Sequence, residues 1–324
     1  MKKLILKSGL YFLLILICLE IIVRIFHLAK DTPTRYVDQN NVEKWMPNQN
    51  GYAVTGNRRQ NFSEYRINSS GYNSYREFTP SKESIDVALV GDSFIEGFHQ
   101  NYYNSIGKKI ETNLQNNVKV MEFGYAGYDM ADQLHLINAY EDLFKDIDYV
   151  FLGIKFSNDL NRGEYTVVQD RLALESPVNK MLKKSKLLVY CKSIGILDPP
   201  QLLFHRIKNS IRPVITKKKL TEQELKEKKI ENDRKYLENF KNLIALYGYD
   251  KDKFVLLLDS SSTSNIFLDY LNKNNFTYID FFSAFEKSGK PSTLIYDRHW
   301  NDNGRSIIAS LISSYIKKDN RFKK

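Results

Sequence analysis

Short apolar runs alternate with amphipathic stretches along residues 84–317, and this alternation predicts most of the fold. Each apolar run has the length of a buried strand, and the stretches between them place apolar residues at helical spacing. We expect five strands, at 85–90, 118–123, 149–154, 254–258 and 277–282, and helices near 105–115, 129–144, 264–273 and 302–317. Strands that alternate with helices form a parallel sheet with helices on both faces. The pattern therefore predicts an α/β fold of three layers, α/β/α, around a five-stranded parallel sheet.

A basic helical insertion interrupts the alternation at about 160–250. Thr221 and Glu224 have the spacing of a capping box, and Gly248 is placed to end the helix that they begin. Between these residues the apolar positions repeat at helical spacing: Leu225, Tyr236, Leu237, Phe240, Leu243, Ile244 and Tyr247. We expect these side chains to make core contacts.

The amino-terminal segment has the features of a membrane anchor. Residues 4–26 are apolar except for Lys7, Glu20 and Arg24, and a helix of this length covers roughly the hydrocarbon thickness of a bilayer. A carboxylate in lipid is costly, and Arg24, one helical turn after Glu20, is its obvious partner. The alternative is a cleaved signal peptide, but no small-residue cleavage site follows the apolar run. The lysines before the run place the amino terminus in the cytoplasm and everything after residue 30 outside.

The rest of the chain divides around the predicted sheet. Residues 31–83 are polar, rich in Asn and Tyr and without clear periodicity, so we expect an irregular extracytoplasmic lead-in from the membrane. The α/β domain occupies 84–317, with the insertion at 160–250, and a basic tail follows at 318–324.

The net charge of +10 is concentrated in one segment. Eleven basic residues and one acidic residue lie between Lys180 and Lys219, so the rest of the chain is neutral overall. Such a segment suits an anionic surface, either lipid headgroups or an acidic polymer. The alternative is a solvated helical face that keeps the protein soluble. No nucleic-acid-reading module accompanies the charge, so nucleic acid is not an expected partner.

The spacing of the cysteines and histidines predicts neither a disulfide framework nor a metal site. Cys18 and Cys191 are the two cysteines, so a disulfide framework is not expected. No CxxC motif or His/Cys cluster is present, and we expect no metal site and no cofactor.

Reactive residues follow four of the predicted strands. The first strand leads into Gly91-Asp92-Ser93, the second into a turn that contains Gly127, and the third into Asn158. The fifth is followed by Asp297 and His299. Since ligands bind beyond the carboxyl ends of parallel strands, these residues are expected around one cavity. They supply what acyl transfer requires: a nucleophile, a base, a group that orients the base, and donors for the oxyanion.

These motif blocks resemble those of the SGNH/GDSL hydrolase superfamily, over roughly residues 84–317 with the insertion between them. The resemblance implies an SGNH or flavodoxin-like sheet. The anchor with its internal Glu20 and Arg24, and the Asp-x-His-Trp-Asn-x-x-Gly ending, are similar to bacterial membrane-tethered members found near cell-surface polysaccharide genes. A single-pass protein with an extracytoplasmic catalytic domain is what this likeness implies.

The resemblance also assigns roles to the site residues. Ser93 would be the nucleophile, His299 the general base, and Asp297 the residue that orients the imidazole. The Ser93 and Gly127 N–H groups and the Asn158 amide would form the oxyanion hole. No metal or diffusible cofactor takes part in such a mechanism.

The sequence departs from the family pattern at three places. Many members place the acid three residues before the histidine, whereas here Asp297 stands two before it, so Asp302 or a backbone carbonyl could orient the ring instead. Phe156 stands where the third block usually begins with glycine, which would narrow the pocket. Glu122 stands where an Asn is common.

The five histidines provide an internal comparison. His27 lies at the membrane boundary, His205 in the basic insertion and His135 within a predicted helix, where structural roles are the default. His99 follows the serine turn and is a candidate for lining the pocket. His299 is the histidine beside an acid in a loop that follows a strand, as a catalytic base requires.

Three functions are compatible with these residues. The first is an extracytoplasmic ester hydrolase or O-acyltransferase, acting on an acetyl ester of a surface polysaccharide. The second is a phospholipase or lipase whose basic insertion approaches the membrane lipid. The third is a catalytically inactive domain that binds glycans or assembles an export complex.

Overall fold

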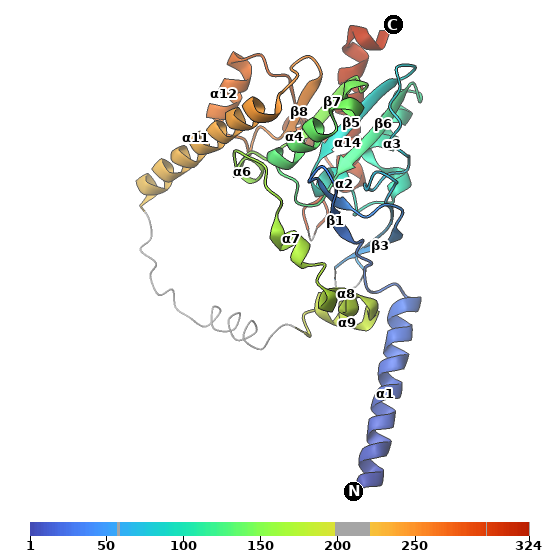
Figure 1. The fold of residues 1–324 in the computed structure, drawn as a ribbon. Coiled ribbons are helices and arrows are strands. Elements are labelled where there is room, and N and C mark those ends of the chain that lie inside the picture. Colours follow the sequence, from blue (N-terminus) through green and yellow to red (C-terminus); the bar gives the residue numbers. More distant parts are fainter. Residues whose placement is uncertain (57–58, 198–220, 296, 324) are drawn as a thin grey trace.

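The computed structural model describes residues 1–56, 59–197, 221–295 and 297–323. At its centre lies a sheet of five parallel strands in the order β6-β5-β7-β8-β9 (Figure 1). The strands are β5 (Ile85–Gly91), β6 (Val118–Gly124), β7 (Tyr149–Gly153), β8 (Phe254–Leu258) and β9 (Tyr278–Asp280). The first of them in the chain lies between the second and the third, which is the flavodoxin-like order. The predicted α/β fold with a five-stranded parallel sheet is confirmed.

Helices cover both faces of this sheet, because alternate strand residues point to opposite sides. Ala88 and Val90 of β5 belong to one apolar core and Val87 and Leu89 to another. The first core is closed by α4 (Met130–Ala139), α11 (Glu222–Tyr247) and α12 (Asn265–Lys273). The second is closed by α3 (Ile106–Asn113) and α14 (Asp302–Lys318). The three-layer arrangement is as predicted.

The insertion between β7 and β8 is helical, as expected. It contains α6 (Phe156–Asp159), α7 (Gln169–Ala173), α8 (Pro177–Lys184), α9 (Lys186–Ser193) and α11. The capping box of Thr221 and Glu224 is formed, and Gly248 caps the far end of α11. Phe240 and Leu243 are fully buried against the sheet core, so these two positions make the core contacts that the helical spacing predicts. Residues 198–220, which carry His205 and part of the basic segment, lie outside the described residues.

The lead-in at 31–83 is more regular than we expected. It forms two antiparallel hairpins, from β1 (Arg35–Val37) with β2 (Glu43–Trp45) and from β3 (Asn50–Thr55) with β4 (Asn61–Arg66). Trp45 and Tyr65 are buried in the same core as one face of the main sheet. These strands are short and carry polar residues on both faces, so they leave no alternation of apolar positions in the sequence.

Smaller elements complete the domain. They are α2 (Ser93–Glu96), η1 (Tyr102–Asn104), α5 (Glu141–Lys145), α13 (Phe282–Lys287) and η2 (Asn320–Lys323). The fifth strand is shorter than predicted, because the chain turns into α13 two residues after Asp280.

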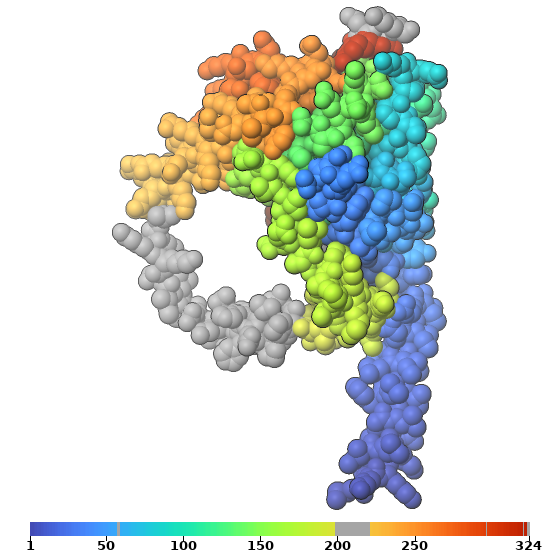
Figure 2. All heavy atoms as spheres, in the orientation of Figure 1, coloured from blue at the N-terminus to red at the C-terminus, as the bar shows by residue number. Residues whose placement is uncertain are grey.

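Helix α1 (Lys2–Ile25) projects away from the body of the protein (Figures 1 and 2). Nearly all of its side chains are exposed, although its mean hydropathy is high. Among the described residues it is the one helix long and apolar enough to cross a membrane. Glu20 and Arg24 form the expected ion pair, with 2.6 Å between their charged atoms.

Candidate active site

Ser93 stands at the carboxyl end of β5, where the chain turns directly into α2. Because β5 pairs with β6 on one side and β7 on the other, this end of β5 is the topological switch point of the sheet. Asp92 caps α2 by accepting from the Phe94 N–H at 2.9 Å, and it also lies 2.5 Å from the Lys155 ammonium. The carboxylate of Asp92 therefore braces the turn that presents Ser93.

The hydroxyl of Ser93 meets the imidazole of His299. The distance between Ser93 Oγ and His299 Nε2 is 2.8 Å, a hydrogen bond between residues 206 positions apart. His299 is held in place by the loop before α14: its carbonyl accepts from the Leu294 N–H at 2.7 Å, and Asn301 caps α14. Arg298, just before it, has a φ of 63°, a left-handed conformation that costs energy for a residue with a side chain.

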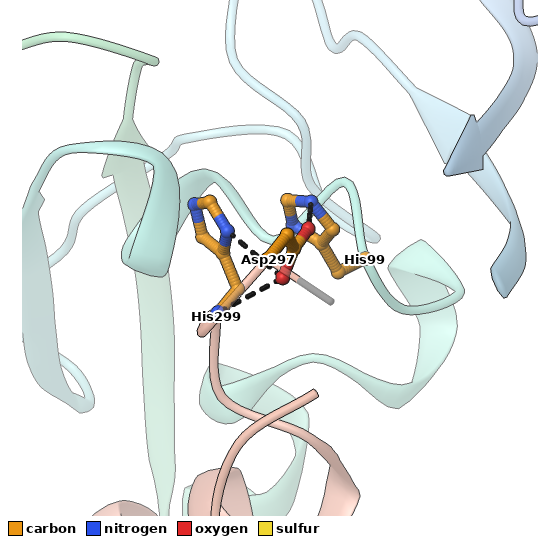
Figure 3. Close-up of side chains that lie close together, drawn as sticks. All are labelled: His99, Asp297 and His299. Carbon is orange, nitrogen blue, oxygen red and sulfur yellow. Dashed lines mark hydrogen bonds and ion pairs between the residues drawn. The ribbon is translucent and has the colours of Figure 1, made fainter. Parts of the chain in front are cut away.

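Asp297 lies beside the same imidazole (Figure 3). Its Oδ1 accepts from the main-chain N–H of His299 at 2.9 Å and lies 3.3 Å from His299 Nδ1. The Nδ1 contact is close but not aligned as a hydrogen bond. The carboxylate thus fixes the main chain of His299 directly and faces its ring.

Asp302, the alternative acid, is engaged elsewhere. Its carboxylate lies 2.8 Å from the Lys109 ammonium and accepts from the Asn104 amide at 3.1 Å. The hydrogen bond from Lys109 lowers the pKa of Asp302. The structure therefore places Asp297, and not Asp302, against His299.

His99 is the second partner of Asp297, and the sequence indicated only that it could line the pocket. Its Nε2 lies 2.7 Å from Asp297 Oδ2, and its ring stacks on that of His299 with 4.0 Å between centroids (Figure 3). Burial, and then the neighbouring His299, lower the pKa of His99 to about 4. His99 is therefore neutral at pH 7 and donates its Nε2–H to the carboxylate.

The loop after β6 brings Gly127 close to the serine turn. The Tyr125 N–H donates to the Gly91 carbonyl at 3.1 Å, and the Ala126 N–H donates to Glu96 at 3.0 Å. Gly127 has a φ of 93°, which favours glycine, and its carbonyl accepts from Arg171. Within the described residues, neither the Ser93 N–H nor the Gly127 N–H donates to a protein acceptor.

Asn158 lies in α6, exposed at the carboxyl end of β7. Its amide donates to Asp159 Oδ1 at 2.8 Å, and in the described part of the chain no hydrogen bond joins it to Ser93 or His299. Asp159 is buried, and burial followed by the nearby Asp92 raises its pKa to about 7. Asp159 thus braces the turn of Asn158, as Asp92 braces that of Ser93.

Phe156 packs into the apolar core, and the narrowing of the pocket that we expected from it stays a prediction. Its ring is buried between Tyr236 of α11 and Phe267 of α12, at 5.5 and 5.1 Å from their ring centroids.

Glu122 is the other position that departs from the family pattern. Its carboxylate accepts from the Gly107 N–H at 3.0 Å and so connects β6 to α3.

A cavity of about 450 Å³ lies beside the turn that carries Ser93. Its walls include the immediate neighbours of Ser93 and His299 in the chain. Aromatic and aliphatic side chains line it, with charged groups among them: Phe94, Phe281, Phe285, Trp300, Leu257, Asp92, Lys155, Asp159, Asp259 and Arg298. The cavity offers both flat apolar surfaces and hydrogen-bonding groups.

His99, Asp297 and His299 also form the one set of side chains, among the described residues, that could hold a metal ion. Their ligand atoms lie within 4.8 Å of one another. A cation there would have to displace the 2.7 Å hydrogen bond between His99 and Asp297. Without a cation, hydrogen bonds join Ser93 to the His299 ring and His99 to Asp297, and Asp297 Oδ1 lies 3.3 Å from the other ring nitrogen of His299.

Comparison with known proteins gives structural neighbours only. No family model matches the chain, and no curated protein matches its sequence. The fold is similar to a lipase/acylhydrolase from Enterococcus faecalis, with 16% identity, a TM-score of 0.39, and 72% of this chain and 96% of that one covered. It is also similar to a member of the lipolytic protein G-D-S-L family from Veillonella parvula, with 12% identity, a TM-score of 0.37, and 73% and 100% covered.

A third neighbour is a carbohydrate acetylesterase family member from Sinorhizobium meliloti, with 8% identity, a TM-score of 0.37, and 72% and 98% of the two chains covered.

Proposed function

We propose that this chain is a membrane-tethered serine hydrolase that cleaves an acyl ester. The observation that carries the proposal is the 2.8 Å hydrogen bond between Ser93 Oγ and His299 Nε2. In the proposed reaction, His299 takes the Ser93 proton while Oγ attacks the ester carbonyl. The tetrahedral intermediate collapses to an acyl-enzyme as His299 protonates the leaving alcohol. Water, activated by the same imidazole, then releases the acid.

Asp297 orients His299 in this reaction and stabilises the imidazolium that forms. Its Oδ1 faces the ring nitrogen opposite the one that contacts Ser93. The oxyanion is bound by the Ser93 and Gly127 N–H groups, and removal of one such donor typically costs ~2.7–4 kcal/mol. The amide of Asn158 uses one N–H for Asp159, and in our proposal the other reaches the oxyanion.

We further propose that the substrate is an acetyl ester on a surface polysaccharide. The cavity beside the turn supports a sugar-linked ester, since its lining combines the aromatic residues Phe281 and Trp300 with the charged residues Asp259 and Arg298. Transfer of the acyl group to a sugar hydroxyl instead of water uses the same residues. Helix α1 would hold residues 84–317, the proposed catalytic unit, outside the cytoplasmic membrane, with the amino terminus inside.

A phospholipase is the second candidate. The basic helices α8 and α9 contact the carboxyl end of α1, which would place the domain beside lipid. Aryl esters of increasing acyl length separate the two candidates. A preference for acetyl over octanoyl supports the polysaccharide esterase, whereas the reverse preference supports the phospholipase.

Labelling of the full-length protein in mild detergent with a fluorophosphonate probe tests the proposed chemistry. We expect covalent labelling of the wild type and none of Ser93→Ala. Asp302→Asn is a matched control, because its carboxylate contacts Lys109 and not the imidazole, and it should label normally. Labelling of Ser93→Ala, or its absence in a folded wild type, contradicts the proposal. The latter result would favour the inactive scaffold.

A further inference from the structure

Glu20, the carboxylate within the apolar helix α1, binds the start of another helix. It accepts from the main-chain N–H groups of Lys186 and Leu187 at 2.9 and 2.8 Å and from the Ser185 hydroxyl at 3.0 Å. These groups are the amino terminus of α9, whose first N–H groups have no partner within the helix. A negative charge at this position is also favoured by the helix dipole.

Arg24 completes the connection. Its guanidinium pairs with Glu20 and donates to the Lys184 carbonyl, the last of α8, at 2.7 Å. The Glu20–Arg24 pair thus holds the end of one basic helix and the start of the next. We call α8 and α9 together the interfacial unit, residues 177–193. The polar groups of this unit explain why a charged pair persists within an apolar helix.

The interfacial unit lies at the level where the apolar run of α1 ends. Figure 1 shows α8 and α9 beside the last turns of α1, and Figure 2 shows the same segment packed against it. Since the run covers roughly one hydrocarbon thickness, a bilayer around α1 would have its headgroup region at Glu20 and Arg24. The unit is therefore placed at a membrane surface.

Its side chains suit that position. Val178, Met181 and Leu182 share one face of α8 by their spacing and are 66%, 69% and 44% exposed. Ile196 and Leu197, just beyond α9, are also exposed. Three lysines of the unit are exposed as well: Lys180, Lys184 and Lys192. Apolar residues on one face with lysines around them are typical of helices that lie in the plane of a membrane interface.

A small polar cavity adjoins the unit. It has a volume of about 220 Å³ and is lined by Lys30, Lys183 and Lys186, with Asp31 and Tyr65 among its other residues. Lys183 pairs with Glu175 and Lys186 with Asp31, whereas several cations surround Lys30. Desolvation, followed by the charges of Arg35, Lys192 and Lys183, lowers the pKa of Lys30, although this residue keeps solvent-exposed surface. An anionic group would relieve this repulsion.

We propose that the interfacial unit binds the surface of an anionic phospholipid bilayer. The apolar face of α8 enters the headgroup region, the exposed lysines pair with lipid phosphates, and the cavity beside Lys30 receives one headgroup phosphate. Because Glu20 and Arg24 fix the unit to α1, this second contact sets the height and tilt of the catalytic domain above the membrane. The inference does not depend on the chemistry at Ser93.

Quenching by brominated lipid tests the contact in the full-length protein. A tryptophan in place of Met181 reports on α8 in nanodiscs of phosphatidylcholine and phosphatidylglycerol, with wild-type emission subtracted. We expect brominated lipid to quench most of the added emission in Met181→Trp. Leu246→Trp is the matched control: this residue is also exposed, at 58%, but lies on α11, and its emission should be unchanged. Equal, weak quenching of both variants overturns the proposal.

The charge contribution is tested by replacing three lysines. Exchange of Lys180, Lys184 and Lys192 for Glu should reduce the quenching of Met181→Trp in discs that contain phosphatidylglycerol. The same exchange at Lys226, Lys228 and Lys229, which are exposed on α11, should leave it unchanged. If neither exchange changes the quenching, the proposed pairing of these lysines with lipid phosphates is wrong. A response of the tryptophan to a soluble acidic polysaccharide, with no quenching by lipid, would assign the surface to a polymer instead. Thermal unfolding verifies that each variant is folded.

Discussion

Asp297 uses its two carboxylate oxygens for two different histidines. One oxygen faces the His299 ring and holds its main chain, and the other accepts from His99. Asp297→Asn leaves the shape but removes the charge that stabilises an imidazolium. We expect kcat on an aryl acetate to fall on the order of 10²- to 10⁴-fold, the range that general acid–base catalysis contributes. Asp302→Asn should stay within a few-fold of wild type, and an equal loss in both variants would contradict the role of Asp297.

We expect His99 to act on the proposed reaction through Asp297, as a positioning residue. Its hydrogen bond to Oδ2 keeps the carboxylate aimed at His299, and loss of one such bond is worth about 1 kcal/mol or somewhat more. His99→Ala should therefore lower kcat roughly tenfold and leave KM unchanged. His99→Gln, which keeps an N–H donor, should restore part of the rate. A rise in KM without a change in kcat would show a substrate contact instead.

Asp297 and His99 differ in how far the sequence alone predicts their place in the site. Asp297 and His299 lie two positions apart in a loop after a strand, so the sequence predicts a base with an acid beside it, with Asp302 or a backbone carbonyl as the alternative partner. The meeting of His99 with Asp297 depends on a loop path across 198 positions, which the lead-in stabilises: Asn61 donates to the His99 carbonyl at 3.1 Å. No local pattern encodes that contact. The one signal was the place of His99 just after the serine turn.

At the scale of elements, the residues at the carboxyl ends of the strands determine how closely one strand packs against the turn that carries Ser93. Gly124 ends β6 directly against α2, and a Cβ on it would collide with the backbone nitrogen of Glu96. Gly124→Ala should displace the turn of Ser93, lower stability by roughly 1–3 kcal/mol and reduce ester hydrolysis strongly. Gly153→Ala at the end of β7 is the control, because its Cβ would meet nothing closer than 3.7 Å. Activity assays and thermal unfolding of both variants measure the difference.

The sheet strands are the elements that the sequence predicts best, because buried parallel strands are continuous apolar runs. Val118–Gly124 and Phe254–Leu258 lie within one residue of their predicted bounds. The hairpins of the lead-in were not predicted. Strands β1 and β2 have three residues each, too few to show a period, and β3 and β4 carry polar residues on both faces. The attachment of α9 to Glu20 was also missed, because it joins residues 166 positions apart through main-chain N–H groups. Such groups are present at every helix start and carry no sequence signature.

For the whole molecule, buried carboxyl groups make stability depend on pH. Glu96, Glu122 and Asp159 are all buried, and in each case burial is the main reason that the pKa is raised to about 7. Such a group has a higher pKa in the folded protein than in the unfolded chain. Its full contribution to the stability of the fold is present at a pH below the unfolded-chain pKa, and this contribution is lost as the pH rises through the folded-state pKa. For Glu122 this window runs from the ordinary glutamate pKa of 4.5 to about 7. The folded protein should lose stability across it.

Glu122→Gln isolates one of these groups. The amide keeps an oxygen for the Gly107 N–H but never ionises, so the variant avoids the cost of a buried charge at high pH. We expect its unfolding free energy, relative to wild type, to increase between pH 5 and pH 8 by up to about 3 kcal/mol, at 1.36 kcal/mol per unit of pKa shift. Unfolding of the detergent-solubilised protein at several pH values measures this difference. Glu238→Gln on the exposed side of α11 should follow the wild-type curve. If Glu122→Gln also follows the wild-type curve, the prediction is wrong. The charge of Arg305 on α14 would then stabilise the carboxylate of Glu122, and the two buried side chains would form an ion pair at neutral pH.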